Sequence, residues 1–336
     1  MTASEVREWV QDEGNLPTWL STWDEQELIK RFWKSTVANN SKNTLSNRAT
    51  AVKQFSEWSL ETSLSDVTAS DIEQWRDELV TDDYGYRSVR QKLYALSTLF
   101  NYAERHGKLQ ANPVDSVDID HYEKTKQEEH LDKEYVSKDE FAKMKAACDT
   151  TRQSLICQLF WDTGVRIGEA VDIRLDDIDE GNRSVTIETS KTKKMEKDQE
   201  RIVYYSRKFE STLNDWRYRG DRESYLGASG SDYLLVSEEA HQMHETTVGD
   251  ILRDVSKRSN VLKEVYEDQS GRQRYWPHPH ALRKSYGVYR TKNGMPVAYL
   301  SDLMGHSDIQ TTKEKYLKFR DDDRREADRK YRPNPY

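Results

Sequence analysis

The chain has 336 residues, of which 35% are hydrophobic and 33% charged. This composition is typical of a protein that folds in water, and no apolar run approaches the roughly 20 residues that a membrane span requires. The net charge of −8 excludes a uniformly basic DNA-binding surface, so any DNA contact needs a local cluster of lysine and arginine. We expect a cytoplasmic protein of two domains, with no signal peptide and no membrane partner.

Residues 1–40 predict one or two short helices that form an N-terminal extension. They contain more acidic than basic residues and make a poor DNA-binding arm. Residues 41–114 predict a small all-helical domain, with polar helix starts at residues 41–44 and 68–71. A longer helix over residues 88–106 carries one apolar face. The four tryptophans of the extension are expected to pack against this domain.

Residues 87–108 hold five basic residues against one acid, with tyrosines between them. Such a helix face is either simply solvated or lies over DNA phosphates. We predict DNA contacts for Lys42, at the start of the first helix of this domain, and for Arg87, Arg90 and Lys92.

Residues 115–135 are polar and dense in charge, and they predict a linker. A second domain follows over residues 136–318, opening with the spacing of a capping box. It is predicted to be mostly helical, with two strands at 184–189 and 201–205 that flank a lysine-rich hairpin, and with helices from about residue 208 onward. Residues 319–336 predict a charged tail, either a solvated helix end or a segment that docks on a neighbouring protomer.

The two cysteines have neither the spacing of a metal site nor a CxxC motif. Cys157 lies in the apolar run LICQLFW, so a reduced thiol in the core is expected. For Cys148 the sequence fits a buried or an exposed side chain equally well.

Four separate motifs carry residues suited to chemistry. In TGVRIGE, Gly164 permits a tight turn, and Glu169 lies one helical turn after Arg166, where it can hold the guanidinium. SKTKK, at residues 190–194, lies in the predicted hairpin. Each motif also has a purely structural interpretation: an Arg–Glu pair at a helix start for the first, and an exposed basic turn for the second.

The other two motifs lie near the end of the chain. In HALRKS, His280 and Arg283 are three residues apart and face the same side of a helix. In MGHSDIQTT, Gly305 ends a helix and His306 follows, with Tyr316 on the next helix. Taken alone, these are an amphipathic helix with a chance histidine and an ordinary packed aromatic.

Together, in this order, the motifs resemble the catalytic domain of the tyrosine recombinase, or phage integrase, family, which includes XerC/XerD-like site-specific recombinases. TGVRIGE matches the first arginine box, HALRKS the HxxR box, MGHSDIQTT the LGH…TT box, and SKTKK the hairpin lysine. The resemblance covers about residues 41–320. It implies a mainly α fold with a small antiparallel β-sheet in the catalytic domain, and a helical core-binding domain that closes with it as a clamp around DNA.

The resemblance also implies partners and chemistry. Double-stranded DNA would be cut and rejoined through a 3′-phosphotyrosyl bond, without metal, cofactor or ATP. Four protomers would act on two DNA sites, with monomers in free solution. Arg166 and Arg283 would hold the non-bridging oxygens, and Tyr316 would attack, helped by the cationic pocket.

The remaining roles follow from the same resemblance. Glu169 would orient Arg166, and His280 and His306 would contact the phosphate or assist proton transfer. Lys191 is the predicted general acid, with Lys193 as the alternative. Lys193 and Lys284 are also predicted DNA contacts, and Lys284 replaces a frequent second histidine of the family.

The sequence departs from the family pattern at two further places, and three alternative functions remain open. His306 and Tyr316 are ten residues apart, where the family usually shows nine, so the register that brings the tyrosine to the phosphate is open. The hairpin is longer than a tight turn. The alternatives are a type IB topoisomerase, a non-catalytic DNA-binding regulator, and a zinc enzyme built on His278 and His280.

Overall fold

The structure is a computed structural model that describes residues 3–11, 19, 23–59, 61, 63–82, 84–118, 134–188, 200–267, 273–306 and 308–319. The chain forms two compact units, Met1–Lys133 and Glu134–Tyr336. Each unit has its own hydrophobic core. The finer division into extension, linker and tail stays a prediction.

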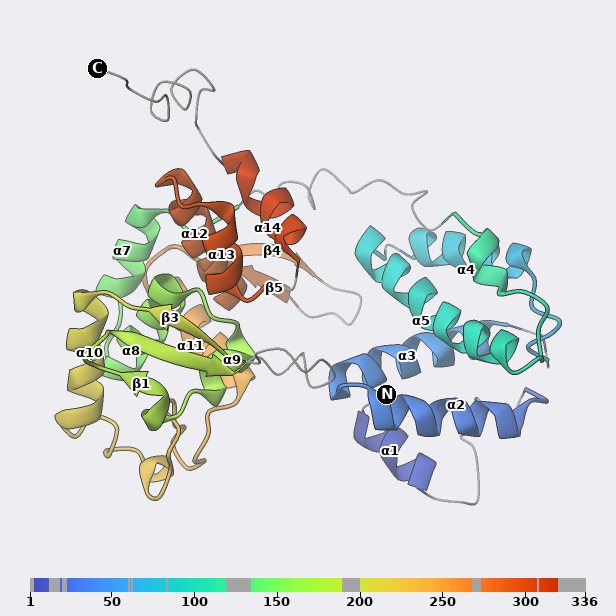
Figure 1. Cartoon of the computed structure of the whole chain (residues 1–336), viewed down its shortest axis with the longest axis horizontal. Helices are drawn as coiled ribbons and strands as arrows, with labels where there is room; N and C mark the ends of the chain where they lie inside the picture. Colours follow the sequence, from blue (N-terminus) through green and yellow to red (C-terminus); the bar gives the residue numbers. More distant parts are fainter. Residues whose placement is uncertain are drawn as a thin grey trace, which may run out of the picture. The chain divides into compact units, whose positions relative to one another are not determined.

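The first unit is a bundle of helices (Figure 1). Ser41 and Thr68 cap two of them, as their side chains accept hydrogen bonds from the backbone amides of Thr44 and Asp71. The core is rich in aromatic residues, and Trp23 and Trp33 are completely buried in it. Residues before 40 therefore pack into the same core as the later helices. The helices are α1 (Ala3–Gln11), α2 (Gln26–Asn39), α3 (Lys42–Trp58), α4 (Ala69–Thr81) and α5 (Tyr86–Arg105), followed by the 3₁₀ helix η1 (Pro113–Ser116).

In the second unit, helix α8 lies in the hydrophobic core, and other helices and a small sheet pack around it (Figure 1). Helix α8 is apolar on most sides because it lies inside the core, and α10 and α12 pack against it. The helices are α7 (Lys138–Ala146), α8 (Thr151–Thr163), α9 (Ile167–Asp172), α10 (Arg207–Tyr218), α11 (Glu245–Arg258), α12 (Pro279–Lys292), α13 (Val297–Met304) and α14 (Ile309–Tyr316), with 3₁₀ turns η2 (Leu175–Asp177), η4 (Leu226–Ala228) and η5 (Leu317–Phe319).

The strands form two antiparallel sheets. The first has the order β1 (Ile178–Asp179), β2 (Ser184–Glu188), β3 (Glu200–Tyr204), which includes the predicted hairpin strands. The second pairs β4 (Lys263–Glu267) with β5 (Gln273–Trp276). The sequence predicted helices and a glycine-rich loop after residue 208, and this pair of strands was not expected. The residues of β4 are mostly charged and exposed, and β5 buries only its last residue, Trp276, so neither strand shows the apolar alternation that identifies a half-buried strand.

Mainly α with small antiparallel sheets is the fold class that the sequence predicted. Within the described part of the chain, no helix combines the length and apolarity needed to cross a membrane.

Candidate active site

A tight turn after α8 positions the first arginine. Gly164 ends the helix with φ of 63°, a left-handed conformation that glycine adopts readily. A Cβ at this position would lie 2.5 Å from the ring of Tyr286. Arg166 then stands at the start of α9, where its Nη1 donates to Glu169 Oε1 at 2.6 Å and its backbone amide donates to Oε2 at 2.7 Å. Glu169 therefore fixes both the backbone and the side chain of Arg166.

Arg201 is a second partner of Glu169, and the sequence reasoning assigned it no role. Its Nη1 and Nη2 donate to the two carboxylate oxygens at 3.0 and 2.7 Å, which is a bidentate pair. Arg201 is opposite Ile187 in the ladder and shares its buried face with Val203. The sequence signal for this role is an arginine at an inward-facing position of a predicted strand, because a buried charge needs a partner.

The electrostatics of Glu169 follow from these contacts. Its side chain is 5% exposed, and burial alone would raise its pKa. The hydrogen bonds and charges of Arg201 and Arg166 outweigh burial and lower the pKa to about 2. The carboxylate is therefore ionised and serves as a counter-charge between the arginines.

Three consecutive carbonyl groups at the end of α13 each accept a hydrogen bond from a different arginine. Leu303 O accepts from Arg201 Nε at 3.0 Å, Met304 O from Arg283 Nη2 at 2.5 Å, and Gly305 O from Arg166 Nη2 at 2.7 Å. The last carbonyls of a helix lack intrahelical partners and carry partial negative charge, so cations are favoured there. This helix end gathers side chains from α9, β3 and α12 in one place.

Arg283 is the most enclosed of these arginines, with 2% of its surface exposed. Its Nη1 donates to Gly164 O at 2.5 Å and lies 3.9 Å from Glu169 Oε2. Burial, and then the charge of Arg166, lower its pKa to about 10, so it is charged at neutral pH. Its Nη2 is 3.4 Å from His306 Nε2, which links the arginines to the histidine after α13.

His306 lies between Arg283 and the tyrosine of α14. Its Nδ1 is 2.7 Å from the hydroxyl of Thr312, a buried residue of the TT motif that received no role from the sequence. Desolvation, and then the charge of Arg283, lower the pKa of His306 to about 4. Its ring is nearly parallel to that of Tyr316, with centroids 6.4 Å apart and an interplanar angle of 10°. With ten residues between them, His306 and Tyr316 are therefore neighbours in the free protein.

Tyr316 ends α14 with 4% of its surface exposed. Its ring lies against Gly287 of α12, where an added Cβ would come within 2.3 Å of Tyr316 Cε1. Burial raises the pKa of Tyr316 to about 12, although Arg283 and Arg166 act to lower it. The expected help from the cationic pocket is present, but burial outweighs it, and the phenol is protonated in the free protein.

Two of the remaining predicted residues of this unit lie on α12 with Arg283, and two lie outside the described residues. His280 presents an accessible edge on α12, and partial desolvation, followed by the charges of His278 and Arg283, lowers its pKa to about 4. Lys284 is half-exposed one residue after Arg283. Lys191 and Lys193 lie outside the described residues. For the zinc alternative, no group of three or more metal-binding side chains occurs among the residues that the structure describes.

In the first unit, the predicted DNA-contacting residues differ in accessibility. Lys42 and Arg87 are exposed. Arg90 is half-buried and donates to the hydroxyls of Tyr86 and Tyr94 at 3.0 and 3.1 Å. Lys92 instead contacts the Gln54 carbonyl and lies over the ring of Tyr84, and desolvation lowers its pKa. Lys92 is held within the unit.

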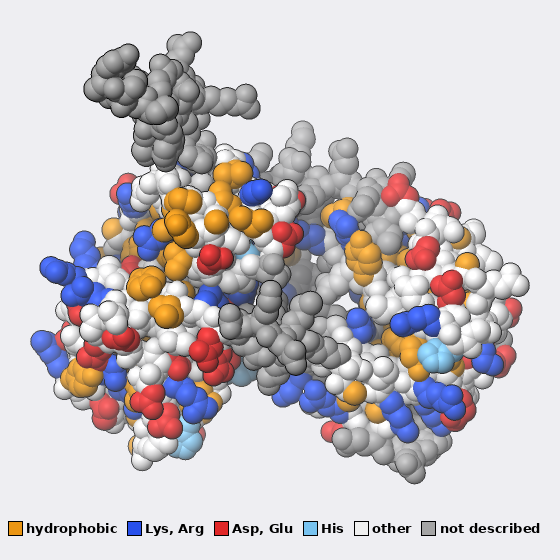
Figure 2. All heavy atoms as spheres, in the orientation of Figure 1, with side chains coloured by type: hydrophobic (Ala, Val, Ile, Leu, Met, Phe, Trp, Pro, Cys, Tyr) orange, Lys and Arg blue, Asp and Glu red, His pale blue; other side chains and the backbone are white. Residues whose placement is uncertain are grey.

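Helix α5 carries a polar stripe along its whole length, on the side opposite its buried residues. Spacings of three or four residues place the members on one helical face. Figure 2 shows basic and acidic side chains intermixed over the visible face of the protein, whereas this stripe contains no acid. Its members are Arg87, Arg90, Tyr94, Thr98, Asn101 and Arg105.

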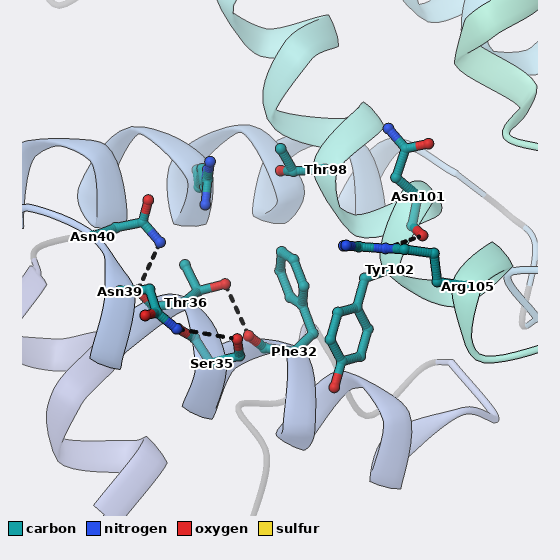
Figure 3. Close-up of a pocket in the computed structure, with 10 residues that line it drawn as sticks. Phe32, Ser35, Thr36, Asn39, Asn40, Thr98, Asn101, Tyr102 and Arg105 are labelled. Atoms are coloured by element: carbon teal, nitrogen blue, oxygen red, sulfur yellow. Dashed lines mark hydrogen bonds between the residues drawn. The ribbon is translucent and has the colours of Figure 1, made fainter. Parts of the chain in front are cut away.

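A polar groove of about 470 Å³ lies at the C-terminal end of this stripe, between α2, α3 and α5 (Figure 3). The lining includes the amides of Asn39 and Asn101 and the guanidinium groups of Arg48 and Arg105, but no acidic residue. Arg48 is half-buried, and within the described residues no hydrogen bond or ion pair reaches its guanidinium. A desolvated cation without a partner makes this groove suited to an anion.

Comparison with known proteins places this geometry in a family. Residues 134–322 match the model of the phage integrase family. A tyrosine recombinase of Thermosipho africanus is 23% identical over 284 residues, covering 82% of this chain and 89% of the relative. Tyrosine recombinase XerC of Oceanobacillus iheyensis is also 23% identical, over 80% of this chain and 82% of its own length.

Solved structures agree in fold. The XerH site-specific recombinase, in a post-cleavage complex with a palindromic difH substrate, matches with a TM-score of 0.65 and 14% identity, covering 98% of this chain and 93% of that one. A lambda integrase dimer bound to a COC′ core site matches with a TM-score of 0.65 and 17% identity, covering 86% and 94%. The family model thus matches more than half of the residues of this chain. The chain therefore belongs to the phage integrase family, the tyrosine recombinases that cut and rejoin DNA in site-specific recombination.

Proposed function

We propose that this recombinase cleaves DNA by attack of Tyr316 on a backbone phosphate held by Arg166 and Arg283. The observation that carries the proposal is the meeting of both guanidinium groups, the imidazole of His306 and the phenol at the α13–α14 turn. In the free protein the two arginines donate to carbonyl groups of this turn. Further N–H groups on each remain for the oxygens of a phosphate.

The attack forms a bond between Tyr316 Oη and phosphorus, and the bond to the 5′ oxygen breaks. Two permanently charged arginines stabilise the charge that develops on the non-bridging oxygens. The raised pKa of Tyr316 means that its proton leaves during attack rather than before it. His306 is neutral near pH 7, and the centroid of its ring lies 6.4 Å from that of Tyr316. We therefore choose His306 as the residue that assists the transfer of the phenol proton.

The leaving 5′ oxygen needs a proton, and we assign it to Lys191, with Lys193 as the alternative. His280 would contact the phosphate from the accessible side of α12. The phosphotyrosyl bond conserves the energy of the phosphodiester, so a second 5′ hydroxyl can reverse the step without ATP. No step in this scheme calls for a metal or a cofactor.

The partner is double-stranded DNA, which the DNA-bound lambda integrase and XerH structures support. A lambda integrase tetramer bound to a Holliday junction, at a TM-score of 0.64, supports assembly of four protomers on two sites, and we expect monomers in free solution and a cytoplasmic location. We infer that the two units close around the duplex. The polar stripe of α5 would follow the backbone, and Arg48 and Arg105 in the groove would hold a phosphate.

A sulfur substitution in the substrate tests the proton donor separately from the nucleophile. When the 5′ bridging oxygen is replaced by sulfur, the leaving thiolate needs no general acid, because thiols are far more acidic than alcohols. We expect Lys191→Ala to cleave ordinary DNA poorly and the sulfur-containing DNA at nearly the wild-type rate. Lys193→Ala serves as the matched control. Equal defects of Lys191→Ala on both substrates would contradict the assignment.

A plasmid assay distinguishes recombination from topoisomerase action. We expect the protein to exchange strands between two copies of its target site and to leave a supercoiled plasmid without that site unchanged. Relaxation of the site-free plasmid would favour the topoisomerase alternative.

A further inference from the structure

The two cysteines of the chain lie next to each other in the second unit. Cys148 follows α7, in the turn before α8, and Cys157 lies in the middle of α8. Their sulfur atoms are 3.9 Å apart. Cys157 is completely buried, whereas Cys148 is partly exposed. Within the described residues no third metal ligand joins them, so the pair does not complete a zinc site.

The surroundings of Cys148 are those of a reactive thiol. Contact with Cys157 is the largest cause that lowers the pKa of Cys148 to about 7, and Ser154, Lys145 and Arg258 lower it further against the effect of burial. Arg258 also donates to Ala147 O at 3.0 Å and to Gln153 at 2.7 Å, which holds the turn beside the thiol. The contact with Cys148, and then burial, raise the pKa of Cys157, so Cys148 is the thiol that favours the thiolate form.

We propose that Cys148 and Cys157 form an oxidation site, at which a hydroperoxide converts the two thiols to an intramolecular disulfide. The Cys148 thiolate attacks the peroxide, an S–O bond forms, the O–O bond breaks, and hydroxide or an alkoxide leaves and takes up a proton from solvent. Cys157 then attacks the sulfur of the Cys148 sulfenic acid, the S–S bond forms, and hydroxide leaves with the Cys157 proton as water. The two sulfurs lose two electrons in total, and the peroxide gains them.

The local geometry permits this closure. A disulfide requires the sulfurs to approach to about 2 Å, so they must come closer by roughly half of their present separation. Cys148 lies outside both helices, and its backbone amide makes one long hydrogen bond, 3.4 Å to Lys145 O, so a small shift at the end of α7 can bring its sulfur closer to Cys157. The bond would tie this turn to α8, the helix whose C-terminal Gly164 carbonyl holds Arg283.

Thiol counting on the full-length protein tests the proposal without reference to DNA cleavage. The reduced protein is treated with hydrogen peroxide, and its free thiols are titrated under denaturing conditions. We expect both thiols to disappear together, a peptide linking residues 148 and 157 to appear in non-reducing mass spectrometry, and dithiothreitol to restore both. Retention of both thiols, or a disulfide between two chains, would overturn the proposal.

Two variants separate the steps. In Cys148→Ser, the buried Cys157 should stay reduced at peroxide concentrations that fully oxidise the wild type. In Cys157→Ala, oxidation should stop at a sulfenic acid on Cys148 that dimedone captures, with Cys157→Ser as a second form if the alanine variant does not fold. Oxidation of Cys157 at the wild-type rate in Cys148→Ser would show that Cys148 is not the site of attack.

Discussion

At the scale of single residues, Glu169 is the centre of the arginine cluster. Its carboxylate accepts from Arg166 and Arg201 and lies 3.9 Å from Arg283. The side chains of Glu169, Arg201 and Arg283 are at most 10% exposed, so the Glu169 carboxylate is an enclosed counter-charge to these arginines. The same carboxylate holds Arg166 in place through its backbone and its side chain.

Removing the charge of Glu169 should therefore destabilise the second unit. For Glu169→Gln we expect the free energy of unfolding to fall by about 3 kcal/mol, since an enclosed ion pair has lost one partner. Glu210→Gln, which breaks a more exposed pair with Arg183, should cost less than about 1 kcal/mol. Urea unfolding of both variants measures the difference. Similar small losses for the two would contradict the central position of Glu169.

The lowered pKa of His306 predicts how stability depends on pH. In the unfolded chain this imidazole takes up a proton near pH 6.5, whereas in the fold it does so only near pH 4. The unfolded state therefore binds more protons between these values, and the stability of the DNA-free protein should fall as pH falls from 6.5 to 4. The Glu169 contribution is lost at lower pH, as pH falls from 4.5 towards 2.

Urea unfolding between pH 7 and pH 4.5 checks this dependence. His306→Asn should show a smaller decrease in unfolding free energy over that range than the wild type. An unchanged slope would mean that His306 is as well solvated in the fold as in the unfolded chain.

At the scale of elements, the contact between α12 and α14 sets the position of Tyr316. Its ring fills the space above Gly287, four residues after Arg283 on the same helix. One helix face therefore positions both an arginine and the tyrosine.

Substitution of this glycine should displace the tyrosine. In Gly287→Ala the new Cβ would lie 2.3 Å from Tyr316 Cε1, so the ring must move. We expect covalent adduct formation with DNA to slow at least about tenfold, a change of roughly 1.4 kcal/mol in the barrier. Gly249→Ala on α11, where nothing lies within 4 Å, should leave the rate unchanged. Wild-type rates for Gly287→Ala would argue against the position of Tyr316 described above.

Sequence motifs predicted the elements better than the contacts between them. The helix starts at Ser41, Thr68 and Ser137 follow from local capping, and the structure confirms all three. Arg201 contacts Glu169, which is 32 positions away, and Thr312 contacts His306 in the turn before its helix. The motifs alone assigned neither residue a role. The raised pKa of Tyr316 likewise depends on burial by α12, which spacing does not reveal.

At the scale of the whole molecule, a net charge of −8 has to coexist with DNA binding. The acid-free stripe on α5 and the groove, where Arg48 has no partner among the described residues, offer a local solution. DNA affinity then depends on a few basic residues rather than on the overall charge, and it should be sensitive to salt.

Salt dependence tests the groove. Each phosphate contact contributes a slope of about −0.9 in a plot of log affinity against log salt. We expect Arg48→Gln together with Arg105→Gln to weaken DNA binding and to make the slope shallower by about one such contact. Arg31→Gln, an exposed arginine of α2 outside the groove, should change neither. An unchanged slope in the double variant would place the phosphates elsewhere.

The most direct test of the central claim is to identify the residue that becomes covalently linked to DNA. Nicked duplexes of varied sequence lose the short 5′ fragment after cleavage, so the strand cannot be rejoined and the covalent intermediate accumulates. Mass spectrometry of the digested adduct then locates the modified tyrosine. We predict a 3′-phosphotyrosyl bond at Tyr316 in the wild type and no adduct in Tyr316→Phe. An adduct that persists in Tyr316→Phe, or a bond mapped to any other of the 19 tyrosines, would contradict it.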